Sequence, residues 1–145
     1  MSKNPKLNAE GYFDPTAFYG IREADKQLDI KHFTKRNKVP RVYIVSPFAG
    51  DVGTNIVNAR RYCRFALEQG YNPIASHLYY TQFLNDDSPA ERQTGLNLGL
   101  DLLRGCSEVW WFGDTVSKGM YAELCQAKAW RIPSKHYDTN CNEIK

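Results

Sequence analysis

The feature that most constrains the fold is an alternation of short apolar runs and longer amphipathic segments that begins at Val42. The short runs are rich in β-branched and aromatic residues, as is typical of strands buried on both faces. They cover residues 42–46 (VYIVS), 71–77 (YNPIASH), 108–113 (EVWWFG) and 132–137 (IPSKHY). Helices are predicted between them, over 55–71, 90–106 and from the 113–119 loop to residue 130. The order β-α-β-α-β-α-β predicts an α/β fold, a three-layer αβα sandwich around a parallel sheet of four to five strands.

The chain is long enough for one such domain and little more. It has 145 residues, 42% of them hydrophobic, which is enough for a real core. Residues 1–38 are polar, and Asp14 before Pro15 is a typical start for a helix over 16–28. We therefore expect an N-terminal helical extension and linker over 1–38, followed by the α/β domain over 39–145.

Composition excludes several classes of function. The net charge of +3 is too small to indicate nucleic-acid binding, and the basic segment 31–41 is interpreted as a solvated linker rather than a nucleic-acid-binding arm. The four cysteines form no C-x-x-C pair and have no histidine at metal-ligand spacing, which argues against a zinc site or a disulfide framework. No run is long and apolar enough to span a bilayer, and we find no signal peptide. We expect a cytoplasmic protein without metal, cofactor, membrane or nucleic-acid partner.

Glu123 is out of place on its predicted helix. Its face otherwise carries apolar or small residues, namely Gly119, Met120, Ala127 and Trp130. Burying a carboxylate is unfavourable unless hydrogen bonds hold it or it has a chemical task. A salt-bridged glutamate at the edge of the stripe is the alternative, and the pattern does not decide between the two.

Two further residues have a functional and a structural interpretation. Asp101 lies on the polar side of its predicted helix with Thr94 and Asn97, where a solvent-exposed aspartate is the simpler reading. Tyr43 lies inside a strand that should be buried, so its hydroxyl needs a partner even if the ring is an ordinary core residue.

Ligands of parallel α/β sheets bind beyond the carboxyl ends of the strands, and unusual residues gather at that edge here. The loop 46–55 (SPFAGDVGTN) is neither a P-loop nor G-x-G-x-x-G, but a glycine-bearing loop before a helix can hold a phosphate or a sugar. The segment 115–119 (TVSKG) offers a second such helix start. Two helix starts at one edge predict a nucleotide-sized ligand. The predicted substrate-binding residues are Ser46, Phe48, Gly50, His77, Gly113, Ser117, Lys118 and Gly119.

The stretch 42–137 resembles the nucleoside 2-deoxyribosyltransferase-like superfamily. The resemblance is carried by VYIVSPFAGD, by the aspartate in GLDLLRGCSEVWWF and by SKGMYAE. That group includes 2'-deoxynucleoside 5'-phosphate N-hydrolases and uncharacterised relatives from phages and mobile elements. The resemblance implies a deoxyribosyltransferase or flavodoxin-like fold, a nucleoside or nucleotide ligand, and a homo-oligomer whose subunits complete one another's sites.

The resemblance also implies roles for single residues. Glu123 matches the nucleophile that attacks C1' of the sugar, Asp101 the acid/base that assists departure of the base, and Tyr43 the residue that holds the nucleophile. Ser117 matches the serine that contacts a 5'-phosphate in the hydrolases, where transferases of free nucleosides carry an aspartate. The first loop, SPFAGD, lacks the arginine typical of those hydrolases.

The sequence leaves three functions to be compared. The first is cleavage or exchange of the N-glycosidic bond of a nucleoside or nucleoside 5'-monophosphate. The second is a nucleotide-binding protein of the same fold without turnover, which has no need of a buried glutamate. The third, a phosphoribohydrolase of the lysine-decarboxylase-like type, is weakened because no PGGxGTxxE motif occurs.

Overall fold

The computed structural model describes residues 39–145, and the helix expected over 16–28 lies outside the described residues. The elements occur in the order β1 (Arg41–Val45), α3 (Val52–Glu68), β2 (Asn72–Ile74), α4 (Ser76–Tyr79), the 3-10 helix η1 (Tyr80–Gln82), α5 (Pro89–Arg104), β3 (Glu108–Phe112), α6 (Lys118–Ala129), β4 (Ser134–Tyr137) and β5 (Glu143–Ile144).

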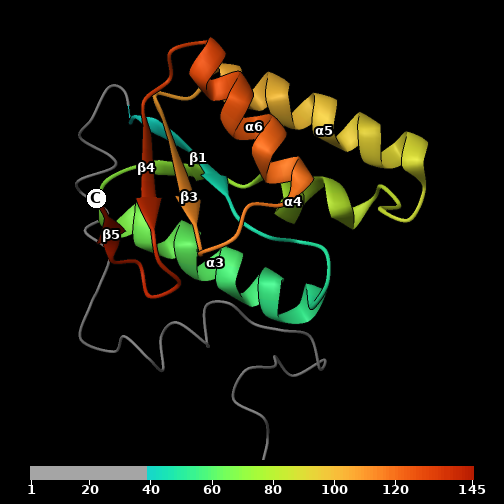
Figure 1. The fold of residues 1–145 in the computed structure, drawn as a ribbon, viewed down its shortest axis with the longest axis horizontal. Coiled ribbons are helices and arrows are strands. Elements are labelled where there is room, and N and C mark those ends of the chain that lie inside the picture. Colours follow the sequence, from blue (N-terminus) through green and yellow to red (C-terminus); the bar gives the residue numbers. More distant parts are fainter. Residues whose placement is uncertain (1–38) are drawn as a thin grey trace, which may run out of the picture.

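The strands form one five-stranded sheet in the order β2-β1-β3-β4-β5 (Figure 1). β1 pairs in parallel with β2 and β3, and β3 pairs in parallel with β4. These findings confirm the predicted α/β class and the predicted strand count. The sheet is not wholly parallel, because β5 runs antiparallel to β4 after a turn in which Asp138 accepts hydrogen bonds from the backbone amides of Asn140 and Asn142.

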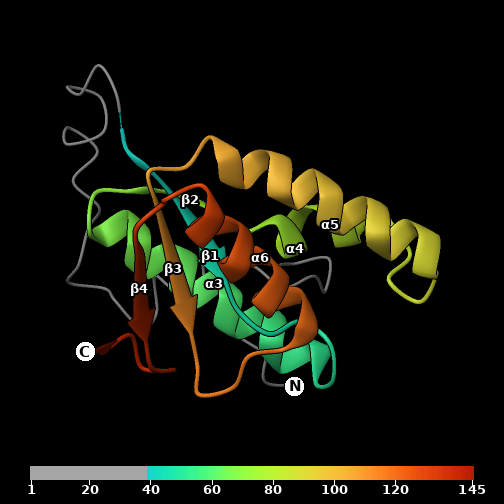
Figure 2. The same ribbon diagram turned by 45° about the horizontal axis from the view of Figure 1, so that its top comes forward.

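Helices cover both faces of the sheet, which confirms the three layers. α3 lies against one face, while α5 and α6 lie side by side on the other (Figures 1 and 2). Because side chains alternate along a strand, Val42 and Ile44 face α3, whereas Tyr43 faces α5 and α6. No helix in the part of the chain that the structure describes is both long and apolar enough to cross a bilayer.

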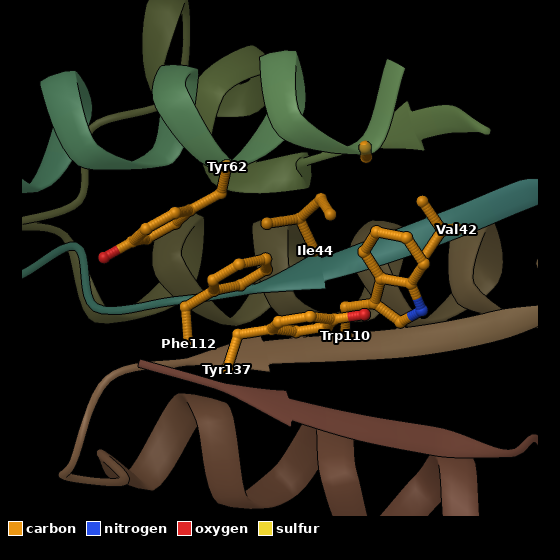
Figure 3. Packing of buried hydrophobic residues seen from close by; sticks show 7 residues of the cluster. Val42, Ile44, Tyr62, Trp110, Phe112 and Tyr137 are labelled. Atoms are coloured by element: carbon orange, nitrogen blue, oxygen red, sulfur yellow. The ribbon is translucent and has the colours of Figure 1, made fainter. Parts of the chain in front are cut away.

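The core under α3 is aromatic. Tyr62 of α3 stacks on Phe112 of β3, with ring centroids 4.0 Å apart, and Phe112 stacks in turn on Tyr137 of β4 (Figure 3). Trp110 completes this layer beside Tyr137. The face is therefore filled by packing alone, which leaves the opposite face for the functional residues.

The second strand is shorter than predicted. It ends at Ile74, and Ser76 and His77 lie in the short helix α4 instead of a strand. The aromatic segment that follows is helical, and the rings of Tyr79, Tyr80 and Phe83 pack on one another. The α4–η1 segment lies at the carboxyl end of the sheet and packs against α5.

The connections define where a ligand can enter. From β1 the chain leaves through α3 on one face to β2, and it returns through α5 on the other face to β3. The two crossovers diverge at the carboxyl ends of β1 and β3, and such a switch point opens a crevice in parallel α/β sheets.

Candidate active site

A pocket lies at this switch point, at the carboxyl edge predicted from the sequence. Its walls come from the loop after β1, from α4 and η1, from the first half of α5 and from the start of α6. Ser46, His77 and Glu123 are among the lining residues. The fold thus brings together side chains up to 77 positions apart in sequence, counted from Ser46 to Glu123.

Helix α6 supplies Glu123. The helix begins at Lys118, and the Ser117 side chain caps it by accepting a hydrogen bond from the Met120 amide at 3.2 Å. Met120 and Ala127 bury the inner face of the helix, and Glu123 lies between them with its side chain partly buried. This burial raises the pKa of Glu123 to about 7, although a hydrogen bond from Tyr43 lowers it in part.

Tyr43 holds the Glu123 carboxylate from the sheet side. The Tyr43 hydroxyl donates to Glu123 Oε1 at 2.8 Å and lies 2.6 Å from Ser76 Oγ. Tyr43 is fully buried, and this burial together with the charge of Glu123 raises its pKa far above the usual range. Its phenol therefore stays protonated and acts as a donor. The sequence indicated that the buried Tyr43 hydroxyl needs a partner, and Glu123 accepts its proton.

His77 forms a second polar pair in the pocket. Its Nε2 atom lies 3.1 Å from Ser46 Oγ, and the Phe48 ring meets it edge-on with centroids 6.3 Å apart. Burial lowers the pKa of His77 to about 4, so the imidazole is neutral at physiological pH. A neutral histidine offers a ligand one donor and one acceptor without a charge.

The predicted substrate-binding residues divide into two groups. Five of them line the pocket, namely Ser46, Phe48, His77, Ser117 and Gly119. Gly50, Gly113 and Lys118 do not. Gly50 and Gly113 instead allow turns with φ values of +92° and +101°.

Asp101, for which the resemblance implies an acid/base role, is not among the residues that line the pocket. On α5 the pocket-lining residues repeat every three or four positions, through Arg92, Gly95 and Leu96, and Gly99 follows on the same stripe against Tyr43. Asp101 lies two positions after Gly99, about 200° further round the helix, and its side chain is exposed. The exposed aspartate suggested by the pattern alone is what the structure has.

Several polar residues of the pocket were not predicted from the sequence. Asp86 and Glu91 supply carboxyls from the loop before α5 and from its first turn, and Arg92 supplies a guanidinium. Within the described residues 39–145, Arg92 makes no ion pair. The signal that could have found Glu91 and Arg92 is the small-residue stripe of Gly95 and Gly99, which marks the face of α5 that approaches the sheet.

The described part of the chain contains no group of three or more histidine, cysteine, aspartate or glutamate side chains arranged to hold a metal ion. Cys63, Cys106, Cys125 and Cys141 are free thiols. The polar side chains that line the pocket carry carboxyl, hydroxyl, imidazole and guanidinium groups.

Comparisons with known proteins place the chain in a family. The protein-family model described as Domain of unknown function (DUF7768) matches residues 40–137, so the chain belongs to that family. No curated protein matches the chain. Among solved structures, the 2-deoxyribosyltransferase of the psychrotolerant bacterium Bacillus psychrosaccharolyticus is similar, with a TM-score of 0.54 and 16% identity, over 72% of this chain and 77% of that one. At this identity the likeness concerns the fold, and it confirms a deoxyribosyltransferase-like α/β architecture.

Proposed function

We propose that the protein cleaves or exchanges the N-glycosidic bond of a nucleoside or nucleoside 5'-monophosphate, with Glu123 as the nucleophile. The observation that carries this proposal is the Glu123 carboxyl itself, partly buried in a pocket, with its pKa raised to about 7 and one oxygen held by Tyr43. The 2-deoxyribosyltransferase with the similar fold is described as a biocatalyst for the synthesis of antiviral and antitumoral nucleosides. Fold and buried carboxyl together favour glycosyl chemistry over other uses of a nucleotide.

In the proposed reaction a Glu123 oxygen attacks C1' of the sugar. The C1'–N bond breaks, its electron pair leaves with the base, and an ester forms between the sugar and Glu123. Water or a second base then attacks C1' and releases the carboxylate, which gives hydrolysis or transfer. The hydrogen bond from Tyr43 to Oε1 fixes the carboxylate and leaves Oε2 for the attack.

The leaving base needs a proton, and Asp101 is poorly placed to supply it. Asp86 and Glu91 are the other carboxyls that line the pocket, so they are the candidates for the acid. Glu91→Gln or Asp86→Asn should slow base release most for poor leaving groups. Asp101→Asn, which changes an exposed side chain on the far side of α5, is the matched control.

Two groups of the pocket support the proposal that the ligand carries a 5'-phosphate. The Ser117 hydroxyl lines the pocket, and so does the Arg92 guanidinium, which makes no ion pair within residues 39–145, whereas Lys118 does not line it. Calorimetry should therefore show tighter binding of monophosphates than of nucleosides, with a preference that weakens in salt. Arg92→Gln should remove more of this preference than Lys118→Gln, and the reverse order would restore the original assignment to Lys118.

The decisive assay is incubation with a panel of deoxynucleosides, ribonucleosides and their monophosphates, with chromatographic detection of free base. We expect release by the wild type to rise with pH through about 7, as Glu123 ionises. Glu123→Gln should lower release about 10³-fold or more while ligand still binds. A nucleotide-binding protein without turnover is the second candidate, favoured by the absence of Asp101 from the pocket lining. It would be established by tight binding to one nucleotide with no base released from any compound.

A further inference from the structure

Ser76 is the one member of the Tyr43 hydrogen-bond chain that neither the sequence pattern nor the resemblance assigns. It lies at the start of α4, lines the pocket, and is 7% exposed. Its Oγ atom is 2.6 Å from Tyr43 Oη, and Tyr43 Oη is 2.8 Å from Glu123 Oε1. The three oxygens therefore form a chain from α4 through the sheet to α6.

The direction of this chain follows from counting protons. An ionised carboxylate only accepts hydrogen bonds, so the single phenol proton of Tyr43 is given to Glu123. Tyr43 then has no second proton for Ser76, and the serine must be the donor in the bond between them. When Glu123 is charged, the order is Ser76 to Tyr43 to Glu123, with every proton pointing towards the negative charge.

The packing of α5 supports a specific arrangement of the Tyr43 and Ser76 hydroxyls. A Cβ atom at Gly99 would lie 2.9 Å from Tyr43 Oη and 3.0 Å from Ser76 Oγ. Glycine is the least favourable helix residue after proline, yet α5 places one directly over the two hydroxyls. The α5 backbone at Gly99 fills the space beside the two hydroxyls and leaves Tyr43 and Ser76 as each other's hydrogen-bond partners.

We propose that Ser76 is a positioning residue for Glu123: its hydroxyl proton on Tyr43 Oη commits the phenol proton of Tyr43 to the Glu123 carboxylate. The inference deepens the proposed function, on which it rests for the task of Glu123. The hydrogen-bond chain itself is measurable in the absence of any substrate. Because hydrogen bonds in a chain polarise one another, removal of the first donor weakens the last bond.

The test is the pKa of Glu123 in the ligand-free, full-length protein. Glutamate labelled with ¹³C at the carboxyl carbon reports ionisation by NMR between pH 5 and 9, and the Glu123 signal is identified by its loss in Glu123→Gln. Tyr43→Phe removes the donor and should raise this pKa by about 1 unit or more. Ser76→Ala should raise it by ~0.1–0.7 unit, the share expected from polarisation along the chain. Ser76→Cys keeps the volume with a weaker donor and should raise the pKa by less.

The combined variant separates positioning from a general structural effect. If Ser76 acts through Tyr43, Ser76→Ala should change nothing further once Tyr43→Phe is present. Ser46→Ala is the matched control, since it removes another buried serine hydroxyl of the same pocket that is paired with His77 instead of Tyr43. This control should leave the pKa of the ligand-free Glu123 unchanged.

Two results would overturn the inference: no rise of the pKa in Ser76→Ala and Ser76→Cys, or a rise that persists in the Tyr43→Phe background. Neither depends on turnover. A protein that releases no base, yet shows the shift and its dependence on Tyr43, would refute the glycosidase proposal and leave the role of Ser76 intact. Base release without the shift would do the opposite.

Discussion

Replacement of Glu123 by glutamine should stabilise the protein, and the gain should depend on pH. Burial raises the pKa of Glu123 from the usual 4.5 to about 7 in the folded protein. Between these values the native state holds a proton that the unfolded chain releases, so stability falls as pH rises. Below pH 4.5 the penalty is absent, and above pH 7 it is complete. A shift of this size corresponds to about 3 kcal/mol at about 1.36 kcal/mol per pKa unit.

Glutamine keeps the shape of the side chain and still accepts the hydrogen bond from Tyr43, but it carries no charge. We expect Glu123→Gln to be more stable than the wild type at pH 8, with a difference about 2 kcal/mol larger than at pH 5. Urea unfolding followed by tryptophan fluorescence measures both values. A constant offset from altered packing affects the two pH values equally, so the change between them isolates the charge.

Two controls separate the effect of the Glu123 charge from other effects of pH. Burial lowers the pKa of His77 from 6.5 to about 4, which destabilises the native state as pH falls below 6.5. That contribution is common to wild type and variant and cancels in their difference. Asp101→Asn removes an exposed carboxylate and should change stability by less than about 0.5 kcal/mol at either pH. A gain in Glu123→Gln that is equal at pH 5 and pH 8 would refute the claim that Glu123 is ionised at a cost to folding.

The other predictions concern the elements that position this carboxyl. Gly99→Ala should destabilise the protein by about 1–3 kcal/mol, because the new Cβ would lie 2.9 Å from Tyr43 Oη, whereas Gly95→Ala on the same helix meets only Leu84 Cδ1 at 3.5 Å and should be neutral or stabilising. Equal melting temperatures for the two variants would contradict the close approach of α5 to Tyr43. Ser117→Ala should cost about 1 kcal/mol through loss of the α6 cap, measured by urea unfolding, and no loss would mean that the hydroxyl is free for a ligand.

Much of the architecture was predictable because each buried element has a clear period in the sequence. The strand 42–46 and the helices over 55–71 and 90–106 were recognised within a few residues of β1, α3 and α5. β5 was missed because a strand of two residues carries no period. The segment 71–77 was extended too far because its apolar residues fit a strand and a short helix equally well, and tertiary packing selected the helix.

The site was predictable where one residue contradicted its surroundings. Glu123 in an apolar stripe and Tyr43 in a buried strand each required a partner, and the structure makes them partners of each other. Asp86, Glu91 and Arg92 are polar residues in a polar stretch, and their own residue types do not distinguish a pocket wall from a solvated surface. For Glu91 and Arg92 the available signal was the stripe of Gly95 and Gly99 further along the same helix. Asp101 was assigned a role from the resemblance, although its helical spacing already placed it on the polar face of its helix.

The free-energy cost of keeping Glu123 charged in the folded protein bears directly on the choice between an enzyme and a binding protein. A glutamine at this position would fill the same space and accept the same Tyr43 bond without the free-energy penalty that a buried charge brings above pH 7. A pocket that only holds a neutral sugar gains nothing from the charge. A negative oxygen, held on one side by Tyr43 and open on the other, has an obvious use where positive charge develops, as it does at C1' when a glycosidic bond breaks. If glutamine at position 123 stabilises the fold, preserves ligand binding and stops base release, the three measurements together identify the charge as the catalytic feature of the site.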